Sequence, residues 1–150
     1  MEKIFKGSCQ CQDVKYKVTG SPLTLFVCHC TECQKQSASA FGMALWIRQK
    51  EVELISGELK TWVRTMPSGR KMACDFCPNC GTRIFHRQVD KAEMISIKPG
   101  TLDDTSLLKP VGHIWKKSAQ PWIKFEDDCL QFDGNPDSYD EMIRLFSCKS

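Results

Sequence analysis

The residues best suited to chemistry are three cysteines within six positions, Cys28, Cys30 and Cys33, followed by a small, polar run at 34–40. Three thiols this close cannot pair among themselves as disulfides without leaving one over, so we interpret them as metal ligands. A structural zinc ion takes four protein ligands, whereas a catalytic one takes three and leaves its fourth position for water or substrate. The spacing allows an open zinc, or a closed one whose fourth ligand comes from elsewhere. We call these residues the three-cysteine cluster.

Two other cysteine pairs complement each other as one closed zinc site. A two-residue thiol pair rarely holds zinc by itself, so the N-terminal C-x-C pair needs the two thiols of the CPNCG segment. In that segment Pro78 fixes one dihedral and Gly81 tolerates positive φ, so backbone N–H groups can point at metal-bound sulfurs. This site, the four-cysteine cluster, is predicted to be structural. Its members are Cys9, Cys11, Cys77 and Cys80.

The remaining cysteines and two histidines each have a structural and a chemical interpretation. Cys74 could close the second zinc or simply pack near the knuckle, and Cys148 is expected to be a free thiol near the C-terminus. Cys129 is a small buried residue or a nucleophilic thiol. His29 lies between two ligands, so its side chain should point away from their metal. His113, in a turn beside an aromatic residue, is a pocket wall or proton carrier, or a structural hydrogen-bonding group.

The elements that must position these residues are mostly short strands. Apolar residues alternate with polar ones at 13–19, and the neighbouring segments 51–55 and 59–65, separated by Ser-Gly-Glu, are predicted to form a hairpin. Apolar residues at helical spacing near the C-terminus predict one short amphipathic helix. We therefore predict a mainly β chain with one short C-terminal helix. The other predicted strands are 23–27, 41–47, 70–76, 82–87, 93–98, 111–115 and 122–125.

Composition favours one domain over residues 1–150 and a reducing compartment. The ten cysteines cluster in C-x-C and C-x-x-C spacings, which suits metal thiolates better than a disulfide framework. No stretch approaches the ~20 apolar residues of a membrane span, and no apolar run follows the charged N-terminus, so we expect a soluble, cytoplasmic protein. Zinc-bound thiolates would cancel the formal charge of +3. Because the chain also lacks a long Lys/Arg run, we do not expect a nucleic-acid partner.

Five motifs together resemble the glutathione-dependent formaldehyde-activating enzyme family, which also includes centromere protein V. The resemblance runs from about residue 7 to about residue 132. The cysteine order and spacings within these motifs are highly specific. The motifs are GSCQCQDVKYKV, CHCTECQKQSASAFG, FCPNCGTRIF, PGTLDD and PVGHIWKKSAQPW.

The resemblance implies a fold, two metals and an activity. The fold is a tent-like arrangement of twisted β-sheets built around the zinc knuckle. The four-cysteine cluster matches the family's structural zinc and the three-cysteine cluster its second zinc, giving two zinc ions per chain. Cys74 belongs to neither site. The named activity joins formaldehyde to glutathione as S-hydroxymethylglutathione and is classed as a carbon–sulfur lyase, so a small molecule, such as a glutathione adduct, is the expected partner.

Several functions are compatible with these parts. An open zinc at Cys28, Cys30 and Cys33, the candidate catalytic residues, can polarise a small carbonyl or imine, which suits a carbon–sulfur lyase. A hydrolase of imines or other small electrophiles would use the same groups. The chain could instead be a non-catalytic zinc module that binds another macromolecule, or act through thiol redox chemistry at Cys129. The aromatic residues that could line a pocket are Trp46, Trp115 and Trp122.

Overall fold

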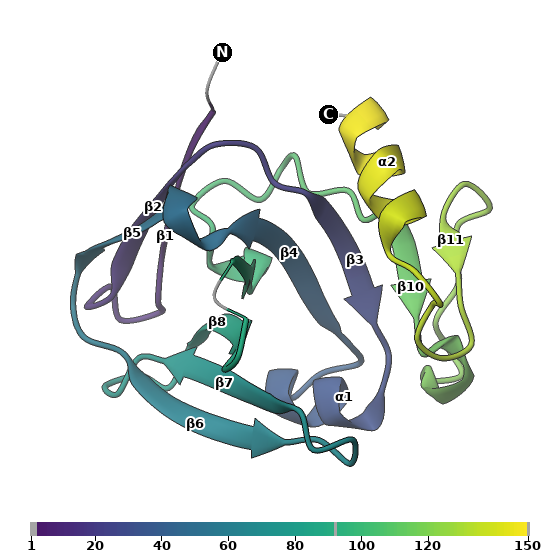
Figure 1. The fold of residues 1–150 in the computed structure, drawn as a ribbon, viewed down its shortest axis with the longest axis horizontal. Helices are drawn as coiled ribbons and strands as arrows, with labels where there is room; N and C mark the ends of the chain where they lie inside the picture. The colour runs from purple at the N-terminus through teal and green to yellow at the C-terminus, as the bar shows by residue number, and fades with distance from the viewer. Residues whose placement is uncertain (1–2, 92, 150) are drawn as a thin grey trace. The chain divides into compact units, whose positions relative to one another are not determined.

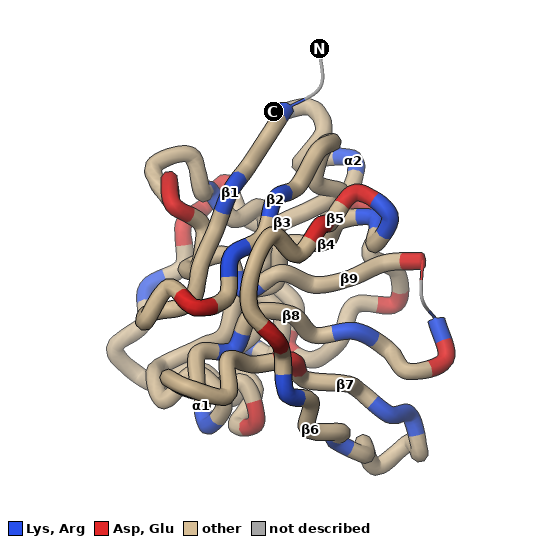
Figure 2. The backbone as a smooth tube through the Cα atoms, turned by 90° about the vertical axis from the view of Figure 1, so that its left-hand side faces the viewer, with Lys and Arg blue, Asp and Glu red and all other residues tan. Residues whose placement is uncertain are grey.

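The computed structural model describes residues 3–91 and 93–149 and is mainly β (Figure 1). The chain forms two compact units, which are described separately, and the single domain expected over 1–150 stays a prediction. No helix among the described residues is long and apolar enough to cross a membrane. Basic and acidic residues are interspersed along the described chain (Figure 2). Unit 1 contains the described residues of 1–22 and 46–107, and unit 2 contains those of 23–45 and 108–150.

Unit 1 begins with a three-stranded antiparallel sheet. Its order is β1 (Ile4–Ser8), β2 (Lys15–Thr19) and β5 (Val52–Ser56). In β2 the side chains of Tyr16 and Val18 are buried, whereas the lysines between and beside them are more exposed. This is the period-2 pattern of a strand with one face in the core. Two short 3-10 helices also belong to unit 1, η1 (Gln49–Glu51) and η2 (Pro99–Thr101).

The second set of strands in unit 1 is an antiparallel run in the order β9, β8, β7, β6. The predicted hairpin of 51–55 with 59–65 is wrong, because β5 pairs with β2 whereas β6 pairs with β7. At Gly57, φ is +85° and an added Cβ would clash with the backbone oxygen of Asp13, so the connecting segment lies against the chain before β2. The strands are β6 (Lys60–Thr65), β7 (Lys71–Phe76), β8 (Arg83–Gln88) and β9 (Met94–Ile97).

His86 of β8 is held in its neutral form. Its backbone lies opposite Cys74 of β7 and Ser96 of β9. Burial, together with the positive charges of Lys98 and Arg83, lowers the pKa of His86 to about 2. Nη1 of Arg83 lies 3.1 Å from Nε2 of His86, and because arginine can only donate, this ring nitrogen accepts.

We expect the His86→Gln variant to lose less stability than the wild type when the pH falls from about 7 to about 5.5. The pKa of His86 is about 2 when folded and about 6.5 when unfolded, so below pH 6.5 the unfolded chain binds a proton that the folded protein does not. The contribution of neutral His86 is therefore full above about pH 6.5 and is lost as the pH falls towards 2. The wild type should lose about 1 kcal/mol more unfolding free energy. Denaturant unfolding at both pH values measures this, and equal losses would contradict it.

Unit 2 contains strands in the order β11, β10, β3, β4, and β10 is parallel to both β3 and β11. β3 is buried over Thr24–Val27, which suits its continuous apolar sequence. The predicted strand at 122–125 is not formed, because a turn closed by Ile123 N and Gln120 O begins this segment. The strands are β3 (Thr24–Cys28), β4 (Gly42–Arg48, which passes into unit 1 after Leu45), β10 (Gly112–Ile114) and β11 (Leu130–Gln131).

Three short helices complete unit 2. α1 (Thr31–Ser37) directly follows β3, and η3 (Lys116–Ser118) follows β10. The predicted C-terminal helix is confirmed as α2 (Asp140–Lys149). It packs against β3, where the hydroxyl of Thr24 donates a hydrogen bond to the carbonyl oxygen of Met142 at 3.0 Å (Figure 1).

Candidate zinc centres

The four-cysteine cluster comes together within unit 1. Its four sulfurs all lie within 4.8 Å of one another. Sγ of Cys11 is 3.5 Å from that of Cys9 and 3.7 Å from that of Cys77. Sulfurs bound tetrahedrally to zinc at ~2.3 Å lie roughly 3.8 Å apart, so the observed spacing fits this ion. Hydrogen bonds from the side chain and backbone of Thr82 lower the pKa of Cys80 to about 5, which favours the thiolate.

Backbone turns present these thiols. Between β7 and β8, the N–H of Gly81 donates to the carbonyl oxygen of Cys77 at 2.8 Å, with φ of +80° at Gly81. Before β2, the N–H of Val14 donates to Sγ of Cys9 at 3.3 Å. The two pairs are separated by more than sixty residues along the chain. A zinc ion here would therefore join the N-terminal strands to the β7–β8 turn.

The three-cysteine cluster is built locally in unit 2, where β3 ends and α1 begins. Cys28 is the last residue of β3, and Cys30 is the N-cap of α1. Sγ of Cys30 accepts a hydrogen bond from the N–H of Cys33, in the first turn of α1, at 3.3 Å. The three sulfurs lie within 4.8 Å of one another, and Cys30 and Cys33 are partly exposed. Among the described residues of unit 2, no fourth ligand atom joins this group.

The electrostatics of the three-cysteine cluster favour a bound cation. Hydrogen bonds from Cys28 and Cys33 lower the pKa of Cys30 to about 2. The same contacts with Cys30 and Cys33 raise the pKa of Cys28. One thiolate is thus stabilised by its neighbours' protons, and further ionisation needs a positive charge nearby. Soft thiolate donors select zinc over hard cations such as magnesium, so the residues present fit zinc.

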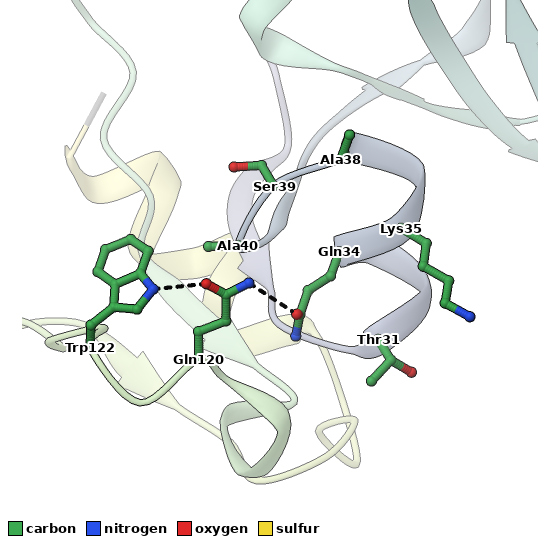
Figure 3. A pocket seen from close by; sticks show the side chains of 8 residues that line it. All are labelled: Thr31, Gln34, Lys35, Ala38, Ser39, Ala40, Gln120 and Trp122. Atoms are coloured by element: carbon green, nitrogen blue, oxygen red, sulfur yellow. Dashed lines mark hydrogen bonds between the residues drawn. The ribbon is translucent and has the colours of Figure 1, made fainter.

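A hollow of about 540 Å³ lies against α1 (Figure 3). Its helical lining residues, 31, 34 and 35, share one face of α1, and Ala38, the C-cap of this helix, also lines it. Cys33 faces elsewhere, because a Cβ added to Gly42 would lie 3.3 Å from the Cβ of Cys33. The hollow therefore flanks the three-cysteine cluster across α1. Its full lining is Thr31, Gln34, Lys35, Ala38, Ser39, Ala40, Gln120 and Trp122.

A chain of hydrogen bonds connects this hollow to the cysteine loop. Nε1 of Trp122 donates to Oε1 of Gln120 at 2.8 Å, and Nε2 of Gln120 donates to Oε1 of Gln34 at 3.3 Å (Figure 3). Nε2 of Gln34 in turn donates to the carbonyl oxygens of His29 at 2.9 Å and Ser118 at 3.0 Å. The side chain of Gln34 thus fixes the backbone between two thiols of the three-cysteine cluster. This role was missed from sequence because glutamine in a polar run gives no signal.

The structure places the other candidate residues as follows. Cys74 is buried in β7 of unit 1, and burial raises the pKa of its thiol; its role as a fourth ligand stays a prediction. Cys148 is exposed near the end of α2. Trp122 lines the hollow, whereas Nε1 of Trp115 donates to Oδ1 of Asn135 at 2.8 Å. Trp46 belongs to unit 1.

Comparison with known proteins identifies the family of this chain. The glutathione-dependent formaldehyde-activating enzyme family matches residues 4–118. The chain belongs to this family. A crystal structure of a Rhodobacter sphaeroides protein is similar with a TM-score of 0.54 and 19% sequence identity, covering 68% of this chain and 91% of that one, and this likeness concerns the fold alone. No curated protein sequence matches the chain. Both cysteine clusters lie inside the family match, whereas Glu126 and Cys129 lie beyond it.

Proposed function

We propose that this family member is a zinc-dependent carbon–sulfur lyase. It forms S-hydroxymethylglutathione from formaldehyde and glutathione and catalyses the reverse cleavage. The three-cysteine cluster supports the proposal, because its three thiols converge without a fourth ligand atom from the described part of unit 2. This is the ligand count of a catalytic zinc site. The four-cysteine cluster would hold a structural zinc, giving one structural and one catalytic ion.

Zinc held by Cys28, Cys30 and Cys33 supplies Lewis acidity and a position for a thiolate. In the forward reaction the glutathione sulfur forms a bond to the carbonyl carbon of formaldehyde. The C=O π bond breaks, the thiol proton is lost and the former carbonyl oxygen gains a proton, so the product is a hemithioacetal. The cysteine loop orients the ligands, since Cys30 caps α1 and Gln34 holds the carbonyl oxygen of His29.

The hollow along α1 suits the peptide part of glutathione. Its volume of about 540 Å³ falls within the usual range for small-molecule sites. Glutathione carries carboxylates and amide groups, and the lining offers the ammonium group of Lys35 and the hydroxyl of Thr31. The amide of Gln120 has a second N–H beyond the one it donates to Gln34 (Figure 3). We assign this hollow to the peptide portion, while the sulfur is directed to the three-cysteine cluster.

Exchange kinetics test the proposed reaction. Formaldehyde and glutathione react spontaneously, so NMR exchange spectroscopy should compare the rate of S-hydroxymethylglutathione formation and cleavage with and without the zinc-loaded protein. We expect acceleration with glutathione and much less with 2-mercaptoethanol, which lacks the carboxylates and amides. If the exchange rates with the protein equalled the spontaneous rates for both thiols, the lyase function would be contradicted. If the protein instead accelerated hydrolysis of a small imine, the alternative function as a hydrolase would replace it.

A further inference from the structure

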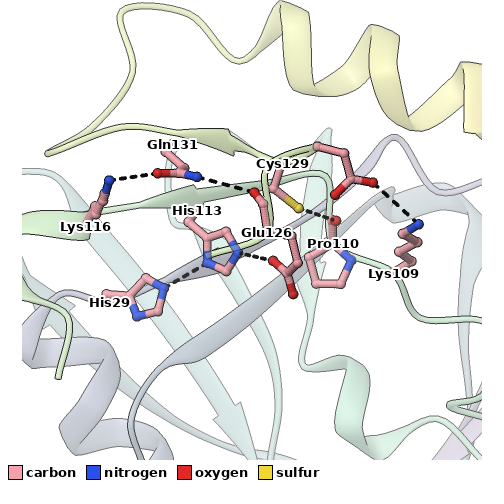
Figure 4. Close-up of polar contacts among 9 residues, drawn as sticks. His29, Lys109, Pro110, His113, Lys116, Glu126, Cys129 and Gln131 are labelled. Atoms are coloured by element: carbon pink, nitrogen blue, oxygen red, sulfur yellow. Dashed lines mark hydrogen bonds and ion pairs between the residues drawn. The ribbon is translucent and has the colours of Figure 1, made fainter. Parts of the chain in front are cut away.

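A second polar group in unit 2 centres on His113 (Figure 4). This residue lies in β10, between β3 and β11, and is only 7% exposed. Its Nδ1 lies 2.9 Å from Nε2 of His29, and its Nε2 lies 3.3 Å from Oε2 of Glu126. The ring of Phe125 packs edge-on against both histidines. The imidazole of His113 is therefore fixed in orientation, with one nitrogen turned to a histidine and the other to a carboxylate.

A tight turn brings Cys129 to the same place. The N–H of Cys129 donates to the carbonyl oxygen of Glu126 at 3.2 Å, just before β11 begins. Sγ of Cys129 lies 3.4 Å from the carbonyl oxygen of Pro110 (Figure 4). One ligand atom each from His113, Glu126 and Cys129 lies within 4.8 Å of the other two. A nitrogen, an oxygen and a sulfur donor thus converge from a strand and a neighbouring turn.

These three residues line a hollow of about 270 Å³ within unit 2. Val27, Phe41 and Ile123 contribute apolar side chains to its walls. His29 also lines the hollow and is fully buried, and its Nδ1 has no hydrogen-bond partner among the described residues. The hollow therefore offers space for a small ligand beside the converging donor atoms.

We propose that His113, Glu126 and Cys129 form a further zinc site, whose fourth position faces this hollow. Mixed imidazole, carboxylate and thiolate donors suit zinc and disfavour magnesium or calcium, which prefer oxygen ligands. Nitrogen and oxygen atoms bound tetrahedrally to zinc at ~2.0–2.1 Å lie roughly 3.3 Å apart, as Nε2 of His113 and Oε2 of Glu126 do.

His29 supplies the outer contact that such a site needs. A histidine that binds metal through one nitrogen usually donates its other N–H to a fixed acceptor. With Nε2 of His113 on zinc, the Nδ1–H of His113 would donate to Nε2 of His29 across the observed 2.9 Å. The site is independent of the two cysteine clusters, because it shares no residue with either. Glu126 and Cys129 also lie outside the family match, which ends at residue 118.

The proposal is tested by comparing the zinc content of the wild type with that of variants that each lack one proposed ligand. Full-length protein and variants should be dialysed against micromolar zinc, and the bound zinc per chain measured by mass spectrometry. We expect Cys129→Ser and Glu126→Gln each to bind one zinc fewer than the wild type. Cys148→Ser removes an exposed thiol that belongs to none of the proposed ligand sets and should match the wild type. Because both cysteine clusters are intact in every variant, failure of the proposed lyase activity would not affect this difference.

Thiol protection in the unmodified protein gives a second readout that does not depend on a variant folding. Zinc should slow the alkylation of Cys129 by iodoacetamide about tenfold or more, because a bound thiolate is a weaker nucleophile, and should leave Cys148 unaffected. Equal alkylation rates with and without zinc, or the same zinc content in the wild type and the folded Cys129→Ser variant, would overturn the proposal. The contacts of Glu126 and Cys129 would then be ordinary hydrogen bonds.

Discussion

Cys77→Ser should leave the protein unfolded or insoluble. Cys77 is completely buried, and its sulfur lies 3.7 Å from that of Cys11 in the four-cysteine cluster. Zinc binding to such a thiolate set contributes ~10 kcal/mol or more to folding, which is comparable to the whole stability of a typical domain, about 5–15 kcal/mol. Losing one ligand removes much of this contribution, because the metal joins segments far apart in the chain. Circular dichroism and thermal unfolding, with metal analysis of any soluble protein, measure the effect.

The matched control for this variant is Cys148→Ser, which changes an exposed thiol in α2. Its unfolding temperature and zinc content should equal those of the wild type. A Cys77→Ser protein that unfolds at the wild-type temperature would contradict a structural role for this cluster. A protein that stays folded but loses one zinc would show that the strands of unit 1 do not depend on the ion.

Most strands of the described chain were predicted from sequence, because they carry a local signal, but β1 was not. In and just before β2, alternation of Val14, Tyr16 and Val18 with lysines identifies the buried face without knowledge of any partner strand. The partner of each strand in the sheet does not follow from such a local pattern. β5 and β6 alternate and are separated by a glycine turn, yet they join β2 and β7 respectively. Pairing depends on contacts distant in sequence, which the pattern within a segment does not contain.

The same distinction applies to the candidate sites. The cysteines of both clusters were found from sequence because thiols at C-x-C and C-x-x-C spacing carry a local metal signature. The contact of His29 with His113 was not predicted, since it depends on the parallel pairing of β10 with β3. Glu126 and Cys129 are three residues apart in the sequence, near the C-terminus. They reach His113 only because β11, which follows them, pairs with β10. Only the fold brings these donors together.

Cys28→Ser should leave the protein folded but abolish the proposed turnover. Cys28 ends β3 and is partly exposed, so a serine of similar size opens no cavity in the core. The three-cysteine cluster spans six residues of one loop, so few long-range contacts depend on its metal. We expect one zinc fewer than the wild type and a fall of about 100-fold or more in the protein's acceleration of formaldehyde–glutathione exchange, because the Lewis acid would be lost. Metal analysis, thermal unfolding and NMR exchange spectroscopy measure these three quantities.

Comparing Cys28→Ser with Cys77→Ser shows which cysteine cluster supports the fold and which supports the reaction. If Cys28→Ser keeps full turnover, the three-cysteine cluster is not the catalytic centre, whatever its metal content. If it unfolds as badly as Cys77→Ser, both cysteine clusters are structural, and the chain would be better described as a zinc-stabilised binding module. A folded variant that lacks one zinc and accelerates no exchange, beside an active Cys148→Ser control, would separate the metal that supports the fold from the metal that supports the reaction.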